Sequence, residues 1–118
     1  GTPAGLLLFL NECGLYGTLP WELSLLSNVI SLQVRHNTLV GTVSKELSQM
    51  SKLQELVVSN NSLTGTIPTL LGQLTELEWL DFYTNMMTGT IPTELGLLTK
   101  LEYLDVDINA LTGTIPTE

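Results

Sequence analysis

The sequence predicts an α/β solenoid, a chain wound into stacked coils, and three observations lead to it. Glycines recur every 24 residues along the chain, at Gly17, Gly41, Gly65, Gly89 and Gly113. Apolar residues occupy the same positions in successive 24-residue segments, and each segment contains one short strand-like stretch. A fixed spacing of this length is typical of stacked repeats. One strand per repeat places the strands in a parallel sheet.

The chain divides into four complete repeats and one that is cut short, within a single domain covering residues 1–118. The repeats are 6–29, 30–53, 54–77, 78–101 and 102–118. Residues 78–83 alternate between side chains suited to the outside and to the inside of a coil, which predicts a half-buried strand. Further along, Leu95, Leu98 and Leu101 recur every three residues. That spacing favours short 3₁₀ or single-turn α segments on the outer face.

Seven positions of each repeat hold only apolar residues, and we expect them to form one continuous stacked core. In the fourth repeat these positions are Leu80, Phe82, Met87, Ile91, Leu95, Leu98 and Leu101. In the second they are Leu32, Val34, Leu39, Val43, Leu47 and Met50, together with Val29 from the edge of the preceding repeat.

A second column of identical residues lies four positions before the glycines. Asn37, Asn61, Asn85 and Asn109 occupy it, and Cys13 stands in the same place in the first repeat. A turn between stacked coils leaves backbone groups without water, and an inward asparagine can both donate and accept hydrogen bonds there. We interpret the column as a structural ladder, in which Cys13 takes part weakly through its thiol.

Residues 77–92, LEWLDFYTNMMTGTIP, carry a resemblance to a known family. The pattern LxxLxxLxLxxNxLxGxIPxxLGxL is that of the plant-type leucine-rich repeat, and only Phe82 and Met87 replace leucines of that pattern. The chain resembles this family, in its plant and eukaryotic microalgal versions, over nearly its whole length. The resemblance implies an arc with the parallel sheet on the concave face, short 3₁₀ or helical turns on the convex face, and a second short strand around the Gly-x-Ile-Pro segment.

The resemblance also implies a range of roles and a place in the cell. Members of the family are receptor ectodomains, secreted inhibitors of foreign enzymes, adhesion or wall proteins and, in one lineage, ice-binding proteins. An extracellular or lumenal location is favoured, and the glycosylation sequon that begins at Asn60 is consistent with it. Plant-type arrays carry a paired-cysteine cap, whereas here 1–5 lead straight into a strand and Glu118 ends within a repeat. We therefore expect an internal part of a longer array, or a repeat unit whose ends meet other chains.

The charge of the chain excludes some partners. Twelve acidic residues against four basic ones give a net charge of -8, and the phosphate field of nucleic acid or of an anionic membrane repels such a chain. The longest apolar run, 6–10, is too short to span a bilayer. We expect no nucleic acid, no membrane insertion by this segment and no cofactor.

The residues that point outward from the sheet are free to vary and form the candidate ligand site. Trp79, Tyr83 and Tyr103 are expected within one or two strand spacings of each other, and exposed aromatic side chains anchor interfaces or stack on sugar rings. The ligand-binding residues predicted for the concave face are Trp79, Asp81, Tyr83, Tyr103, Asp105, Asp107, Arg35, Gln33 and Phe9.

Acidic side chains accompany the aromatic ones. Asp81 and Asp105 occupy the same column on neighbouring coils, so their carboxylates repel unless a cation or a basic partner lies between them. Calcium accepts such oxygens, but no loop has its usual ligand spacing. We therefore favour a basic group of a partner, steered by Asp81, Asp105 and Asp107, over a metal; a solvated acidic face without a role is the alternative.

Two further patterns suggest functions that we consider weaker. His36 is the only histidine, and its neighbours in the column, Glu12 and Asn60, offer no nucleophile or paired base, so no catalytic residue is predicted. Threonines flank the glycines in rows, and such rows can match an ice lattice, although threonine is also an ordinary exposed strand residue. The threonines are Thr18, Thr42, Thr66, Thr90, Thr114, Thr64, Thr88 and Thr112.

These observations predict a non-enzymatic module that recognises a protein or a glycan through the concave sheet face. The alternative is a structural or adhesion-type subunit of a larger complex, which contacts its neighbours through open ends or the convex face.

Overall fold

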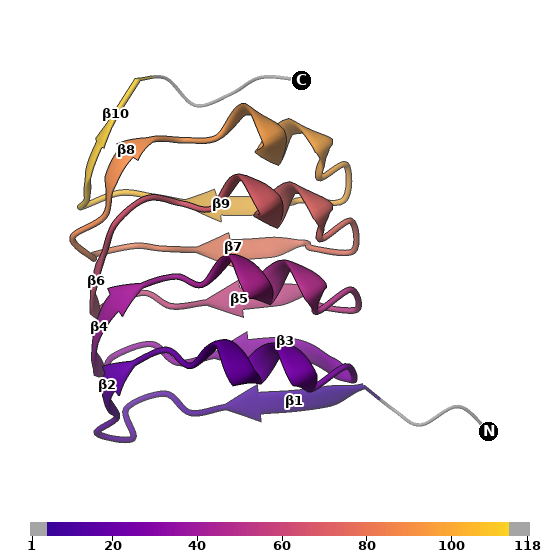
Figure 1. The fold of residues 1–118 in the computed structure, drawn as a ribbon, viewed down its shortest axis with the longest axis horizontal. Coiled ribbons are helices and arrows are strands. Elements are labelled where there is room, and N and C mark those ends of the chain that lie inside the picture. Colours follow the sequence, from indigo (N-terminus) through magenta and orange to yellow (C-terminus); the bar gives the residue numbers. More distant parts are fainter. Residues whose placement is uncertain (1–4, 114–118) are drawn as a thin grey trace.

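A computed structural model describes residues 5–113 as a stack of coils, with one strand of each coil in a common sheet (Figure 1). The sheet is parallel, in the order β1-β3-β5-β7-β9, as predicted from the 24-residue spacing. Leu32 pairs with Leu8, Leu56 with Leu32 and Leu80 with Leu56, so each repeat lies in register on the one before it. The strands are Leu6–Phe9, Val29–Gln33, Glu55–Val57, Trp79–Asp81 and Tyr103–Asp105.

A second row of short strands runs along one side of the stack, as the family resemblance implied. It consists of two parallel groups, β2-β4-β6 and β8-β10. Backbone hydrogen bonds from Met86 N to Leu63 O and from Thr88 N to Gly65 O, both 2.8 Å, join the groups. The strands are Tyr16–Thr18, Thr38–Thr42, Ser62–Thr64, Thr88–Thr90 and Ala110–Thr112.

The outer layer is formed by one 3₁₀ helix in each of the first four coils. The threefold apolar spacing is confirmed as 3₁₀ structure, and residues 5–113 contain no α-helix. The helices η1 to η4 cover Trp21–Leu25, Lys45–Gln49, Thr69–Gln73 and Thr93–Leu97. Within the described part of the chain, no helix has both the length and the apolar character that crossing a membrane requires.

The core lies between the sheet and the 3₁₀ layer, and the predicted apolar columns form it. Leu32, Leu47, Leu80, Phe82 and Met87 have no exposed surface. At the end of its column, Leu101 is half-buried and packs against this core. Burial of a leucine or phenylalanine side chain contributes about 1.5–3 kcal/mol, so the repeated apolar positions stabilise the stack.

A turn with a left-handed backbone follows each strand of the large sheet. The five residues that adopt it have φ between 54° and 58° and are Glu12, His36, Asn60, Thr84 and Ile108. This conformation suits asparagine and is costly for β-branched side chains. Thr84 and Ile108 are therefore held there by the surrounding coils.

The asparagines that follow these turns connect each coil to the one before it. Asn61 Oδ1 accepts from Leu39 N at 3.1 Å, and its amide nitrogen donates to Val34 O and Val58 O at 3.0 Å. Asn37 also accepts from Cys13 N, at 3.1 Å. The thiol of Cys13 is exposed and donates to Asn11 O at 3.4 Å. Since Val34 and Leu39 belong to the preceding coil, each amide links two coils.

All five glycines of the 24-residue column have a left-handed backbone, and in the middle coils a close contact with the preceding coil also favours glycine. Gly65 has φ of 77°, and a Cβ atom added there would lie 2.8 Å from Thr42 Cγ2. Gly89 has the same relation to Thr66, at 2.9 Å. The threonine rows thus pack partly against the glycines of the next coil. Thr114 and Glu118, which the sequence analysis also considered, lie outside the described residues.

Candidate functional site

The solvent-facing side of the five-stranded sheet, which we call the sheet face, carries a stacked aromatic pair. Trp79 on β7 and Tyr103 on β9 are paired in register, and their ring centroids are 3.9 Å apart with planes inclined by 11°. Trp79 is 40% exposed. The neighbouring strands hold the rings about 4.8 Å apart at the backbone, a spacing that suits parallel stacking. Tyr83 is exposed on the turn after β7.

Several outward-pointing side chains are nevertheless buried. Val57, Ser59 and Asp81 have exposed fractions of 4%, 3% and 8%, although all three occupy outward columns. Of the predicted acids, Asp81 therefore lies beneath the surface, whereas Asp107 is exposed and Asp105 is half-buried.

Asp81 has an unusual electrostatic environment. Burial raises the pKa of its carboxyl group, and the neighbouring Asp105 raises it further. Opposing effects on this pKa come from the Tyr83 N–H, which donates to Asp81 Oδ1 at 2.9 Å, from the Ser59 hydroxyl and from the charge of Arg35. Arg35 is therefore the cation of the sheet face whose charge lowers the pKa of Asp81.

The carboxylate of Asp105 is oriented by two hydrogen bonds. The Tyr103 hydroxyl donates to Asp105 Oδ2 at 3.0 Å, and the Asp107 N–H donates to Asp105 Oδ1 at 3.0 Å. The pKa of Tyr103 is raised chiefly because of this bond to Asp105. Asp105 therefore fixes the phenol ring that stacks on Trp79, in addition to presenting charge.

A polar network lies next to the aromatic pair, on β3 and β5. The Ser31 hydroxyl donates to Glu55 Oε1 at 2.7 Å, and Gln33 Nε2 donates to the same oxygen at 3.4 Å. Gln33 Oε1 in turn accepts from Asn11 Nδ2 at 3.1 Å. The carboxylate of Glu55 is consequently held toward β3.

Between this network and Trp79 the sheet face is hollowed. The hollow has a volume of about 150 Å³ and is lined by Gln33, Arg35, Glu55, Val57 and Trp79. Three of these residues belong to the predicted site. Glu55 and Val57 were not predicted, because neither residue type indicates binding by itself. Their positions beside Trp79 and Asp81 in the repeat could have indicated them.

The remaining predicted residues lie apart from this centre. Phe9 is exposed on β1, with β3 and β5 between it and Trp79. His36 is exposed at one of the left-handed turns. Among residues 5–113, no three histidine, cysteine or acidic side chains converge so that they could hold a metal ion.

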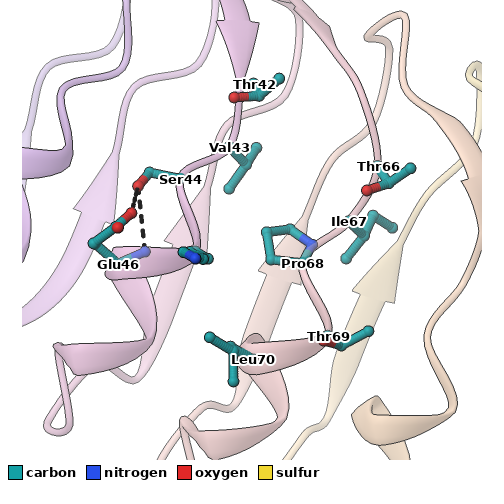
Figure 2. Close-up of a pocket in the computed structure, with 10 residues that line it drawn as sticks. Thr42, Val43, Ser44, Glu46, Thr66, Ile67, Pro68, Thr69 and Leu70 are labelled. Atoms are coloured by element: carbon teal, nitrogen blue, oxygen red, sulfur yellow. Dashed lines mark hydrogen bonds between the residues drawn. The ribbon is translucent and has the colours of Figure 1, made fainter.

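A larger groove lies on the side of the solenoid, between two coils, and Figure 2 shows it. It has a volume of about 550 Å³ and runs between Thr42–Glu46 and Thr66–Leu70. Its carboxylate, Glu46, bonds to the Ser44 hydroxyl, which holds the pKa of Glu46 below its usual range. The rest of the lining is Lys45 together with threonine, proline and aliphatic side chains. The groove brings together no set of groups suited to catalysis.

The fold and the open sheet face, with its one small hollow described above, define a repeat solenoid that displays side chains on a sheet. Residues 51–111 match the Leucine rich repeat family. The chain belongs to that family. No curated protein gave a match.

Similar solved structures come from plants. A chain of the BIR3–SERK2 complex from Arabidopsis thaliana is 34% identical with a TM-score of 0.87; the match covers 92% of this chain and 58% of that one. The plant peptide hormone receptor RGFR1 in complex with RGF2 is 37% identical with a TM-score of 0.84; the match covers 86% of this chain and 16% of that one. A plant ice-binding protein is 35% identical with a TM-score of 0.81, covering 86% and 33%. The chain thus spans less than two thirds of each.

Proposed function

We propose that the protein is a non-enzymatic recognition module that binds another protein through the sheet face, the concave side in this family. The stacked pair of the exposed Trp79 and the half-buried Tyr103 carries the proposal, because tryptophan and tyrosine are the residue types that dominate interface energies. The pair is already ordered in the free protein, so little side-chain entropy is lost on binding. Similarity to a receptor solved with a peptide hormone supports a protein ligand over a glycan.

The charges of the sheet face favour a basic group in the partner. Asp105 and Asp107 lie beside the aromatic pair, and Tyr103 is bonded to Asp105. Carboxylates at the rim of an aromatic contact speed association with a basic partner and select against acidic ones. Arg35 lies on the other side of Trp79 across the hollow. The partner segment therefore carries its positive charge toward the β9 side.

The test is selection of binding peptides from a random display library, followed by mapping of the bound surface. Hydrogen exchange of the complex should show protection at residues 79–83 and 103–107. A selection in which aromatic and basic residues are enriched agrees with the proposal. Protection confined to the 3₁₀ layer contradicts it.

Assembly is a second candidate, favoured by one observation. The first coil exposes the large apolar side chains of Tyr16 and Leu25. In later coils, the Tyr16 column holds Val40 and then threonines, and the Leu25 column holds Gln49, Gln73 and Leu97. Such patches mark association surfaces. On this account, the native protein associates in sedimentation experiments and the double variant Tyr16→Thr, Leu25→Gln does not. A native protein that stays monomeric at high concentration contradicts assembly through the first coil.

A further inference from the structure

We propose that the hollow beside Trp79 is a subsite for one aromatic side chain of the protein partner, which would add a third ring to the Tyr103–Trp79 stack. The inference rests on the proposed function, because it specifies what the sheet face takes from its partner.

The position of the hollow follows from one column of outward residues. Ser31, Glu55, Trp79 and Tyr103 are paired in register on β3, β5, β7 and β9. Two of them are rings in contact. Tyr103 covers the indole of Trp79 on the β9 side, and the lining residues Gln33, Glu55 and Val57 place the hollow on the β5 side. A ring in the hollow would therefore meet the indole opposite Tyr103.

The hollow stays open because the side chain at position 55, which lines it, is held toward β3 and not against Trp79. Glu55 occupies the next stacking position, but Ser31 and Gln33 donate to its Oε1 from β3, at 2.7 and 3.4 Å. These bonds hold the carboxylate toward β3. An aromatic residue at position 55 would fill the space that Glu55 leaves.

The walls of the hollow favour an aromatic ring over a sugar. Val57 is an apolar residue that lines the hollow with 4% of its surface exposed, and Trp79 offers a face for stacking. Arg35 lines the same hollow, and a guanidinium attracts the negative face of an aromatic ring. A sugar ring could stack on Trp79, but it offers Arg35 no such face.

The size of the hollow indicates a single side chain. Its volume is about 150 Å³, which corresponds to about five water molecules at ~30 Å³ each. Sites for drug-sized molecules have volumes of about 300–1,000 Å³. One ring therefore displaces the water of the hollow, and the rest of the partner lies outside it.

The experiment uses N-acetyl-tyrosinamide as the probe, with N-acetyl-leucinamide and methyl glucoside for comparison. A Trp21→Phe background leaves Trp79 as the only tryptophan, so its indole N–H resonance reports the site alone. We expect a saturable shift of this resonance with tyrosinamide, at a Kd of about 1–10 mM, and contacts from the probe ring to the Val57 methyl groups. Shifts with the other two compounds should be at least tenfold weaker.

Two variants of Glu55 separate stacking from general surface binding. Glu55→Phe should fill the hollow and remove the shift, whereas Glu55→Gln should keep it, because the amide still accepts from Ser31. Circular dichroism checks that both variants fold. The contacts between the probe ring and the Val57 methyl groups provide a further test that needs neither Glu55 variant. An absent or unsaturable shift, an equal response to leucinamide, binding of the glucoside in place of tyrosinamide, or an unchanged response in folded Glu55→Phe would overturn the inference.

The proposed function can fail separately. If selected peptides require Trp79 and Tyr103 but bind Glu55→Phe as tightly as the native protein, the hollow inference is wrong and the recognition surface stands. If those peptides bind without Trp79 and Tyr103, the recognition surface itself is wrong.

Discussion

The indole of Trp79 lies parallel to the ring of Tyr103 on the adjacent strand, with 3.9 Å between centroids. The Tyr103 hydroxyl donates to Asp105, two residues further along β9. One hydrogen bond therefore orients the ring that supports Trp79. This connection links the acidic and aromatic parts of the sheet face.

The Tyr103–Asp105 bond predicts how Tyr103 titrates. The pKa of Tyr103 is raised because the bond to Asp105 favours the protonated phenol. The stability that this hydrogen bond contributes is therefore present below the ordinary tyrosine pKa, and it is lost as the pH rises through the pKa of Tyr103 in the folded protein. Absorbance titration, with Tyr103→Phe subtracted to isolate this residue, should show the raised value. Asp105→Asn should lower it; an unchanged titration in that variant contradicts the bond.

Asp81 predicts a pH-dependent gain in stability when its charge is removed. Its pKa is raised by burial and by Asp105, so the folded protein prefers the neutral carboxyl, and this contribution to stability is lost as the pH rises through the folded value. Asp81→Asn, whose amide oxygen can still accept from Tyr83 N–H, should therefore raise the urea midpoint at pH 7.

The gain in Asp81→Asn should shrink at pH 3, where the native carboxyl is protonated. The exposed substitution Asp107→Asn is the control for a general loss of negative charge. An equal gain at both pH values, or the same gain in the control, counts against burial as the cause.

The left-handed turn at Thr84 predicts a stabilising substitution. Thr84 has φ of 58°, and Asn60 holds the equivalent position one coil earlier with the same φ. Because asparagine tolerates this backbone better than a β-branched residue, Thr84→Asn should raise the free energy of unfolding by about 1 kcal/mol. Thr84→Val keeps the branching and should give no gain. Asn60→Thr should lower the free energy of unfolding by a similar amount. If neither Thr84→Asn nor Asn60→Thr changes this free energy, the backbone at Thr84 is not strained.

The asparagine ladder predicts a large loss at its centre. Asn61 is buried, accepts from Leu39 N and donates to Val34 O and Val58 O. Asn61→Leu leaves these backbone groups without partners, at about 1–3 kcal/mol for each buried group. We expect a loss of about 3 kcal/mol or more in urea unfolding. Cys13→Asn, at the exposed end of the same column, should change stability by less than about 1 kcal/mol.

The fold could be predicted because one sequence period encodes it. Leu80 and Phe82 are buried as the alternation requires, and the threefold spacing of Leu95 and Leu98 corresponds to a 3₁₀ helix with its following turn. The left-handed turns at Thr84 and Ile108 could not be predicted, since both residue types disfavour that backbone. Packing of the neighbouring coils imposes it.

The sheet face could be predicted only in part. Alternation places Trp79 and Asp81 on the outward side of the sheet, but it does not show that Asp81 is buried there. The proximity of Trp79 and Tyr103 follows from the repeat, whereas their parallel rings depend on side-chain geometry. The hollow depends on Ser31 and Gln33 drawing Glu55 aside, a contact between coils that no single repeat reveals.

The affinity of a selected peptide for the native protein and for the double variant Trp79→Ala, Tyr103→Ala tests the central claim most directly. Loss of two aromatic anchors of about 1.5 kcal/mol each corresponds to about a 100-fold weaker Kd by titration calorimetry. Tyr16→Ala, an exposed aromatic outside the sheet face, should leave the Kd unchanged. A double variant that folds and binds within about twofold of the native protein would contradict recognition through the sheet face.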